Sequence, residues 1–274
     1  MSLIETDIFG TVDDLVANSI ALIKKYEPPD GYYVAFSGGK DSIVCLDLVK
    51  KAGVKYDVHM NLTSVDPPEL LKFIRQYYPE CQLHRPKMSM FRLIRHKGMP
   101  PTRILRYCCQ LLKEKGGKER EIVITGVRWE ESSQRKLRKV YEKDNKTETY
   151  ILNPIIAWAS DEIWEYIHAN NLPYPDLYNE GFHRIGCIGC PMGNKQRYKQ
   201  FERWPQFKKA YYNTFKKLIE ESQRKTKPAH YKDVETLWAW WMEELPKEDK
   251  QQTKLLFLNE ATNGTLKAKE PAPR

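Results

Sequence analysis

The sequence lacks any long apolar run. Of its 274 residues, 41% are hydrophobic, and the mean hydropathy is −0.66. No stretch approaches the roughly 18–20 consecutive apolar residues that a membrane-spanning helix needs. The first residues, MSLIETDIFG, also lack the basic start and apolar stretch of a secretory signal. We therefore expect a cytoplasmic protein with no membrane partner, long enough to bury a sizeable core.

Cysteine is scarce and unevenly placed. The chain has six: an adjacent pair, a C-x-x-C pair and two single residues, namely Cys108 and Cys109, Cys187 and Cys190, and Cys45 and Cys81. The expected compartment is reducing, which argues against disulfides, and the single cysteines are predicted to be small buried side chains. The two pairs offer four thiolates for Zn²⁺ or an iron–sulfur cluster. Adjacent cysteines are awkward for tetrahedral zinc.

Acidic residues are few in one segment. The net charge is +9, and residues 193–232 hold twelve Lys or Arg against three Glu, so the rest of the chain is near neutral. Such a segment indicates a polyanionic partner, with a solvated helix face as the alternative. Its aromatic residues recur at intervals of three or four, which favours a core-facing stripe over base stacking. They are Phe201, Trp204, Phe207, Tyr211 and Phe215.

Strand-like and helix-like stretches alternate over the first 171 residues. Their patterns predict helices and strands in the order helix 11–26, strand 32–36, helix 42–53 ending at Gly53, strand 56–62, helix 67–78, strand 121–127 and helix 159–171 with Ser160 as N-cap. This alternation predicts an α/β fold, a parallel twisted sheet with helices on both faces. We predict a nucleotide-binding domain over 1–192 and a helical, basic C-terminal extension over 193–274, with a disordered tail at 263–274.

A glycine-rich turn links the strand at 32–36 to the following helix. Its residues are Ser37, Gly38, Gly39, Lys40, Asp41 and Ser42. The glycines let the backbone approach an anion closely, and the helix start offers free N–H groups and a positive dipole end. The serine hydroxyls and the lysine add donors and charge. The alternative is a tight turn without a ligand. The spacing is too short for the G-x-x-x-x-G-K-(S/T) loop.

The stretch SGGKDS resembles the PP-loop of the ATP pyrophosphatase superfamily, whose fold is that of the adenine nucleotide alpha hydrolases. Members cleave ATP between the α and β phosphates, transfer AMP to a substrate oxygen and release pyrophosphate. The resemblance implies that this loop binds ATP and that Lys40 and Asp41 act in catalysis. Asp41 would serve as a Mg²⁺ ligand or as a carboxylate that orders the loop.

Other stretches resemble the phosphoadenosine phosphosulfate reductase family. The C-C…C-x-x-C arrangement is similar to the 4Fe-4S site of assimilatory adenylylsulfate reductases, which implies a cluster on Cys108, Cys109, Cys187 and Cys190; zinc and unbound core cysteines remain alternatives. TGVRWEESSQR (125–135) resembles T-G-(I/V/L)-R-x-x-(E/D)-S-x-x-R, and residues 63–75 and 153–191 resemble further family segments. The resemblance covers roughly residues 30–192. It implies nucleotide binding by Gly126, Arg128 and Arg135, with Arg128 also catalytic, since guanidinium groups bind oxyanions bidentately.

The sequence departs from the reductases in two ways. Reductases attack the activated sulfate with a cysteine near the C-terminus, whereas here no cysteine follows Cys190. Their phosphate loops are often degenerate, because their substrate is already adenylylated, whereas SGGKDS is intact. Both departures favour ATP cleavage and adenylation over sulfate reduction.

We therefore predict an iron–sulfur ATP pyrophosphatase that adenylates an acceptor oxygen and supports sulfur insertion into nucleic acid. DNA phosphorothioation is favoured over tRNA thiolation, with a cysteine desulfurase as sulfur donor; homodimers are common among relatives. One alternative is an adenylylsulfate or phosphoadenylylsulfate reductase that uses an external thiol. Another is a nucleotide- or DNA-binding regulatory protein with a structural metal site.

Overall fold

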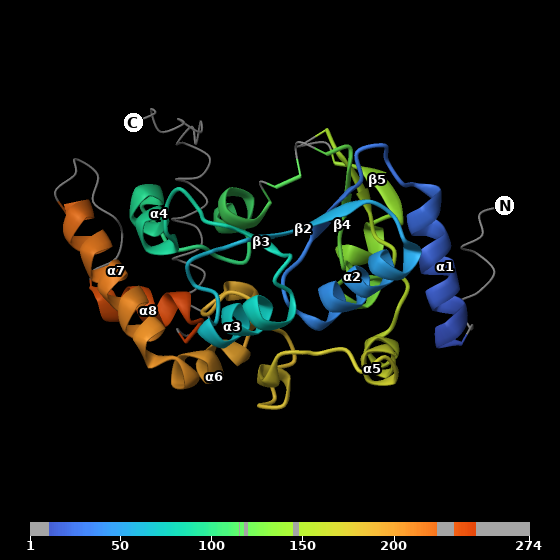
Figure 1. Cartoon of the computed structure of the whole chain (residues 1–274). Coiled ribbons are helices and arrows are strands. Elements are labelled where there is room, and N and C mark those ends of the chain that lie inside the picture. The colour runs from blue at the N-terminus through green and yellow to red at the C-terminus, as the bar shows by residue number, and fades with distance from the viewer. Residues whose placement is uncertain (1–10, 115, 118–119, 145–147, 224–232, 245–274) are drawn as a thin grey trace.

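A six-stranded sheet forms the centre of the molecule (Figure 1). The computed structural model describes residues 11–114, 116–117, 120–144, 148–223 and 233–244. The strands are β1 Tyr32–Ala35, β2 Tyr56–Asn61, β3 Gln82–His84, β4 Ile122–Ile124, β5 Tyr141–Lys143 and β6 Tyr150–Leu152, in the order β3-β2-β1-β4-β6-β5. Neighbouring strands are parallel except β5, which pairs antiparallel with β6.

The helices follow most of the predicted ranges. They are α1 Val12–Lys25, α2 Lys40–Ala52, α3 Pro68–Tyr77, α4 Met90–Lys97, α5 Ser160–Ala169, α6 Gln196–Arg203, α7 Pro205–Gln223 and α8 Val234–Trp241. Gly53 ends α2 with a φ of 68°, the left-handed conformation that glycine adopts without steric cost. The predicted N-cap of α5, Ser160, is wrong by one residue. Ala159 is the cap: its backbone is extended, and its N–H donates to the Glu162 carboxylate at 2.5 Å.

One face of the sheet packs against α1, α2, α3 and α5. Alternate side chains of a strand point to the same face, and on β1 these are the buried Tyr32 and Val34. The run from Ile43 to Val49 on α2 is almost wholly apolar and buried, which places α2 between the sheet and its neighbouring helices. This hydrophobic cluster is the larger core of the molecule and fixes where α2 begins.

The other face of the sheet meets the π-helical turn η1 (Cys109–Lys113) and the residues after it. The Asn61 side chain on β2 donates to the Lys113 carbonyl at 3.1 Å. A Cβ on Gly116 would lie 2.0 Å from the Tyr33 hydroxyl on β1, so a larger residue here would require the side chains of Tyr33 and Asn61 to move. The predicted α/β fold, with a mostly parallel sheet flanked by helices and helices at the C-terminal end, is confirmed.

A second hydrophobic cluster lies at one end of the molecule, where α4, α6, α7 and α8 gather (Figure 1). The predicted aromatic stripe is buried in it at Phe201, Trp204, Tyr211 and Phe215, with Phe207 partly buried. Helix α4 precedes residue 192 yet packs against α7. The boundary at 192 stays a prediction, and the tail at 263–274 lies outside the described residues. Among the described helices, none has the length and apolar character needed to cross a bilayer.

Strand β1 lies where the strand order reverses. From β1 the chain proceeds to β2 and β3 on one side, and later to β4 and β6 on the other. In open α/β sheets, ligands bind in the crevice outside the carboxyl ends of the strands at such a switch point. The loops after β1 and β4 border this crevice, and they are the loops that contain SGGKDS and TGVR.

Candidate functional site

The loop between β1 and α2 is held in a tight turn. Gly38 has a φ of 69°, and a Cβ there would lie 2.7 Å from Ile74 Cδ1 on α3. The Ser42 hydroxyl donates to the Gly39 carbonyl at 2.8 Å and accepts from the Ser37 N–H at 3.2 Å. The turn therefore requires glycine at position 38, and its two serines hold the loop closed over the start of α2.

Asp41 lies between two cations. Its Oδ1 accepts from Lys40 Nζ at 2.9 Å and from Arg128 Nε at 2.7 Å. Lys40 and Arg128 are 5% and 4% exposed, so both charges are largely removed from water. Arg128 also bonds the Trp158 carbonyl at 3.0 Å and Glu130 at 2.7 Å. Burial acts to lower the pKa of Arg128, but the Asp41 and Glu130 carboxylates outweigh it and the pKa is raised.

The loop after β4 approaches α2 closely. A Cβ on Gly126 would lie 3.0 Å from the backbone carbon of Asp41, so glycine lets the two loops meet. Arg135 pairs with Glu131, whose other contact is the Arg128 N–H at 3.2 Å. Burial lowers the pKa of Arg135. All the predicted nucleotide-binding residues thus gather at the switch-point crevice, in positions where they could neutralise phosphate oxygens.

Sequence reasoning missed Tyr178, which lies on the 3₁₀ turn η4 (Asp176–Tyr178). Its hydroxyl accepts from the Lys40 N–H, the first of helix α2, at 2.8 Å. The ring packs edge-on against Trp164 of α5, with centroids 5.0 Å apart. Burial raises the pKa of the Tyr178 phenol, so the hydroxyl is neutral. A tyrosine in an aromatic-rich loop gives no sequence signal that it will contact a helix start 138 residues away.

The two cysteine pairs meet near the second hydrophobic cluster. Cys108 and Cys109 lie at the start of η1, and Cys187 and Cys190 lie in the loop before α6. A hydrogen bond between the first two thiols raises the pKa of Cys108 and lowers that of Cys109, and charge on Cys187 and Cys190 further raises that of Cys108. The Cys187 thiol donates to the Thr63 hydroxyl at 3.4 Å. The thiols are close enough to act on one another electrostatically.

Two cations lie beside these thiols. Arg106 Nη2 donates to Cys109 Sγ at 3.6 Å. The charge of Cys187 raises the pKa of Lys113, which is also influenced by Asp66. Neither cation was predicted from the sequence. Nearby cations favour the thiolate form of cysteine, the form that binds metals and attacks sulfur.

Within the described parts of the chain, no group of three or more His, Cys, Asp or Glu is arranged to hold a metal ion. The single cysteines, Cys45 and Cys81, are buried as predicted, and burial raises the pKa of the Cys81 thiol to about 12.

The C-terminal helices hold the C-x-x-C loop. Gln200 on α6 accepts from the Gly189 N–H at 2.9 Å, and Tyr211 on α7 donates to the Ile188 carbonyl at 3.0 Å. On the other side, the Ile188 N–H donates to the Val65 carbonyl at 2.8 Å. The extension is thus part of the framework of the cysteine pair, a role that its charge and periodicity did not indicate.

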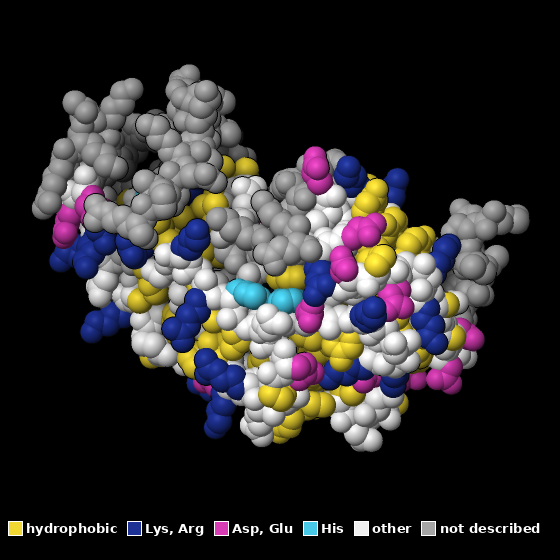
Figure 2. Space-filling view, turned by 45° about the horizontal axis from the view of Figure 1, so that its top comes forward, with side chains coloured by type: hydrophobic (Ala, Val, Ile, Leu, Met, Phe, Trp, Pro, Cys, Tyr) yellow, Lys and Arg dark blue, Asp and Glu magenta, His cyan; other side chains and the backbone are white. Residues whose placement is uncertain are grey.

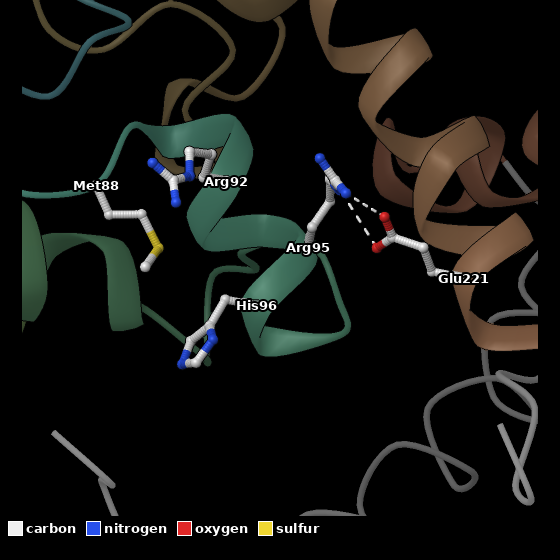
Figure 3. A pocket seen from close by; sticks show the side chains of 5 residues that line it. All are labelled: Met88, Arg92, Arg95, His96 and Glu221. Atoms are coloured by element: carbon white, nitrogen blue, oxygen red, sulfur yellow. Dashed lines mark hydrogen bonds and ion pairs between the residues drawn. The ribbon is translucent and has the colours of Figure 1, made fainter. Parts of the chain in front are cut away.

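An open cavity of about 390 Å³ lies away from both sites, between α4 and α7. Figure 3 shows Arg92 and His96 projecting from α4, while Arg95 reaches across to Glu221 of α7. Arg95 Nε bonds the Glu221 carboxylate at 3.2 Å. Arg92 and His96 are exposed at the cavity.

Comparison with known proteins gives a family match. The sequence profile of the phosphoadenosine phosphosulfate reductase domain matches residues 31–193. An uncharacterised protein of Methanocaldococcus jannaschii is 31% identical over 224 residues, covering 71% of this chain and 45% of that protein. The adenosine 5'-phosphosulfate reductase of Oceanobacillus iheyensis is 30% identical over 166 residues, covering 57% and 69%. The chain thus spans about half the length of the first of these relatives.

Two solved structures resemble the fold. A phosphoadenylyl-sulfate reductase from Candida auris, in complex with phosphate, is 21% identical, with a TM-score of 0.49 over 68% of this chain and 97% of that chain. A mutant FMN adenylyltransferase from Candida glabrata is 16% identical, with a TM-score of 0.50 over 72% and 68%. At this identity the second likeness concerns the fold alone.

Proposed function

We propose a function for this chain, which belongs to the phosphoadenosine phosphosulfate reductase family. It is an ATP pyrophosphatase that prepares an acceptor oxygen for replacement by sulfur. The acceptor oxygen attacks the α-phosphorus of ATP, the bond to the β-phosphate breaks, and pyrophosphate leaves. A sulfide-level sulfur then attacks the acceptor atom that bears this oxygen, and AMP leaves with the oxygen. The observation that carries the proposal is the intact loop from Ser37 to Ser42 at the switch point, with Lys40 and Arg128 against Asp41.

The loop offers what phosphoryl chemistry needs. Catalysis at phosphorus depends mainly on positioning and on cations that stabilise the developing charge. Lys40, Arg128 and Arg135 supply three cations, and the start of α2 supplies backbone N–H groups. Both recorded ion pairs of Asp41 use Oδ1. Its Oδ2 is therefore the oxygen that we assign to Mg²⁺, a hard cation that prefers carboxylate and phosphate oxygens.

We propose that the four paired cysteines hold a 4Fe-4S cluster. The donor set is four thiols from two segments: Arg106 helps to lower the pKa of Cys109, and apolar side chains of the second cluster pack against Cys108 and Cys187. Since no complete metal site is present among the described residues, the thiols would have to turn toward a common centre. The chemistry of such a cluster would be to carry the sulfur that replaces the activated oxygen.

We propose nucleic acid as the acceptor, with DNA ahead of tRNA and a cysteine desulfurase as sulfur donor. Lys and Arg side chains gather over the end of the molecule where α4 and α7 lie (Figure 2). The exposed basic residues on these two helices are Arg92, His96, Lys208, Lys209, Lys216 and Lys217. The basic surface contributed by residues 193–232 is smaller than their charge count indicated, because Arg197 is buried and Arg203 pairs with Glu69 and Glu180. Residues 224–232 lie outside the described part.

The proposal is tested by giving anaerobically prepared protein ATP alone, ATP with duplex DNA, or ATP with tRNA. We expect pyrophosphate release to rise when the true acceptor is present, because the acceptor oxygen is the attacking group. Mass spectrometry of nucleosides from cells with and without the gene should then reveal the sulfur-containing product. Pyrophosphate release that neither nucleic acid changes, with identical nucleosides in both cell types, would contradict nucleic acid as the acceptor.

The cluster is tested separately by iron and acid-labile sulfide analysis. The protein should be brown and contain about four irons per chain, as four thiolate ligands imply. Colourless protein with stoichiometric zinc would overturn the cluster while leaving the ATP chemistry standing.

A further inference from the structure

The cavity between α4 and α7 is lined mainly by polar and charged side chains. Its volume is about 390 Å³, and its lining is Met88, Arg92, Arg95 and His96 from the α4 side and Glu221 from α7. Both arginines carry their charge at every physiological pH, and the lining has a single carboxylate. The charge of the cavity therefore favours an anionic ligand.

The Arg95 guanidinium is bound by a carboxylate in the way that it would bind a phosphate. Arg95 Nε donates to one oxygen of Glu221 at 3.2 Å, and Nη2 donates to the other oxygen. Carboxylates and phosphates both present two oxygens to the edge of a guanidinium, so a phosphate can take the place of Glu221. The two side chains are 39% and 37% exposed. Ion pairs this exposed stabilise a protein little, so this pair opens easily.

The directions of the cations favour a chain of phosphates over a single small anion. Figure 3 shows Arg92 and His96 pointing away from α7, whereas Arg95 points toward Glu221. Cations that point in different directions cannot all bind one small anion, but linked phosphates can meet them one after another. Lys217 extends the positive charge along α7, because it is exposed and lies one helical turn before Glu221.

The opposite face of α4 belongs to the part of the molecule that carries the cysteine pairs. Met90, Leu93 and Ile94 are buried in the second hydrophobic cluster, against which Cys108 and Cys187 pack. A nucleic-acid strand bound at the cavity would therefore lie on the same helical end of the molecule as the cysteines.

We infer that this cavity is a phosphodiester-binding site for the nucleic-acid acceptor, with Arg92 and Arg95 as phosphate-binding residues and Glu221 as a built-in competitor for Arg95. This rests on the proposed function, which supplies the nucleic acid. A backbone phosphate displaces the Glu221 carboxylate and accepts both hydrogen bonds of Arg95. Such contacts position a strand without reading its sequence. Because Glu221 has to be displaced, the site favours a polyanion, which several cations hold at once, over free phosphate.

The main test is Glu221→Gln, because the inference predicts a gain of binding. With the competitor removed, a fluorescent duplex DNA should bind about threefold more tightly at 0.1 M salt. The dependence of log K on log salt should steepen by up to about 0.9, the contribution of one phosphate contact. Glu220→Gln is the matched control, since it removes the same charge from the neighbouring, exposed position of α7. It should leave the slope unchanged.

Loss of the cations should have the opposite effect. Arg92→Gln and Arg95→Gln should each weaken binding about threefold and reduce the slope by about 0.9. The control Lys24→Gln changes an exposed lysine of α1, at the opposite end of the molecule (Figure 1), and should change neither quantity. In the Arg95→Gln background, Glu221→Gln should have no more effect than Glu220→Gln, because no guanidinium remains to be released.

Unfolding temperatures separate this role from a structural one. All variants should unfold at the temperature of the native protein, because exposed ion pairs contribute little. Equal tightening in Glu221→Gln and Glu220→Gln would overturn the inference, since net charge alone would explain it. A lower unfolding temperature in Glu221→Gln without tighter binding would also overturn it, because the pair would then only fasten α4 to α7. If native protein binds DNA and all variants match it, the inference alone fails. If native protein binds no DNA, the proposed acceptor fails as well.

Discussion

The phosphate loop and the cysteine loop differ in how completely their polar groups are paired. In the phosphate loop, Lys40 and Arg128 share one carboxylate oxygen of Asp41, and Tyr178 bonds the first N–H of α2. In the helical end, two donors of Arg197 have no partner among the described residues, and the Cys187 thiol donates to Thr63 over a long 3.4 Å. The first site is therefore closed on itself without a ligand, whereas the second is paired less completely.

The difference also extends to the packing. The phosphate loop is anchored in the large core under the sheet, through contacts such as Gly38 against Ile74. The C-x-x-C loop is anchored by Gln200 and Tyr211 of the helical end. This arrangement predicts that the two sites can be damaged independently, although the segment from Tyr178 to Cys190 joins them.

The largest expected effect is on the helical end. Phe215 is fully buried in the second cluster, and Phe215→Ala should reduce the free energy of unfolding by about 3–5 kcal/mol. Urea denaturation would measure this loss of stability, and hydrogen exchange on the native protein would show which segments open first. We expect exchange to rise around Ile188 and Gly189 before it rises in α2. Equal loss of protection at both sites would show that the two clusters unfold as one.

The next effect concerns the phosphate loop. Lys40→Met removes a buried cation that we assign to the phosphates, and it should lower the rate of pyrophosphate release by about 100- to 1000-fold. Iron content should be unchanged. The control Lys50→Met, on the same helix, removes a surface ion pair with Glu80 and should change the rate by less than about twofold. Loss of iron in Lys40→Met would contradict the independence of the sites.

A smaller effect is expected at Thr63. Its buried hydroxyl accepts from the Cys187 thiol and from the Val65 N–H and donates to Asp66 at 2.9 Å. Thr63→Val keeps the shape but removes these three bonds, so metal affinity should fall by about 10- to 100-fold, with ATP cleavage unchanged.

Thr214→Val is the matched control, since Thr214 is buried and its hydroxyl donates to the Ala210 carbonyl of the same helix at 2.7 Å. Chelator titration would measure the metal affinity of both variants. Equal affinities would show that Thr63 does not contribute to metal binding.

The smallest effect is at Tyr178. A phosphate that binds the Lys40 N–H has to displace the Tyr178 hydroxyl. Tyr178→Phe removes this competitor, and because a hydrogen bond contributes about 1 kcal/mol net, ATP should bind roughly fivefold more tightly. Equilibrium binding of a non-hydrolysable ATP analogue would measure it, with Tyr174→Phe as the control. Weaker binding in Tyr178→Phe would mean that the hydroxyl contacts the ligand instead.

Local patterns in the sequence predicted much of the sheet and its loops. Apolar spacing identified α1, α2, α3 and α5, and the glycine pair after β1 identified the turn at the helix start. These features depend on residues close together in the chain. The strands β3, β5 and β6 were not predicted, because each has only three residues and lies outside a longer apolar stretch such as EIVITGV, which identified β4.

The partners that complete each site could not be predicted, because they come from distant segments. The ring under Arg197 belongs to Trp241, 44 residues further on, and no feature of a basic run indicates which arginine turns inward. Likewise, Tyr178 and Thr63 are ordinary residues in sequence, and their roles come from the tertiary fold that brings them to Lys40 and Cys187.

The central claim is that the intact loop cleaves ATP. The most direct test offers ATP and adenylylsulfate together, with thiols, duplex DNA and tRNA, to the same reconstituted protein and follows AMP, pyrophosphate and sulfite. We predict AMP and pyrophosphate from ATP in equal amounts, no sulfite, and loss of both products in Lys40→Met. Sulfite formed from adenylylsulfate while ATP remains intact would contradict the claim and favour a reductase that uses an external thiol.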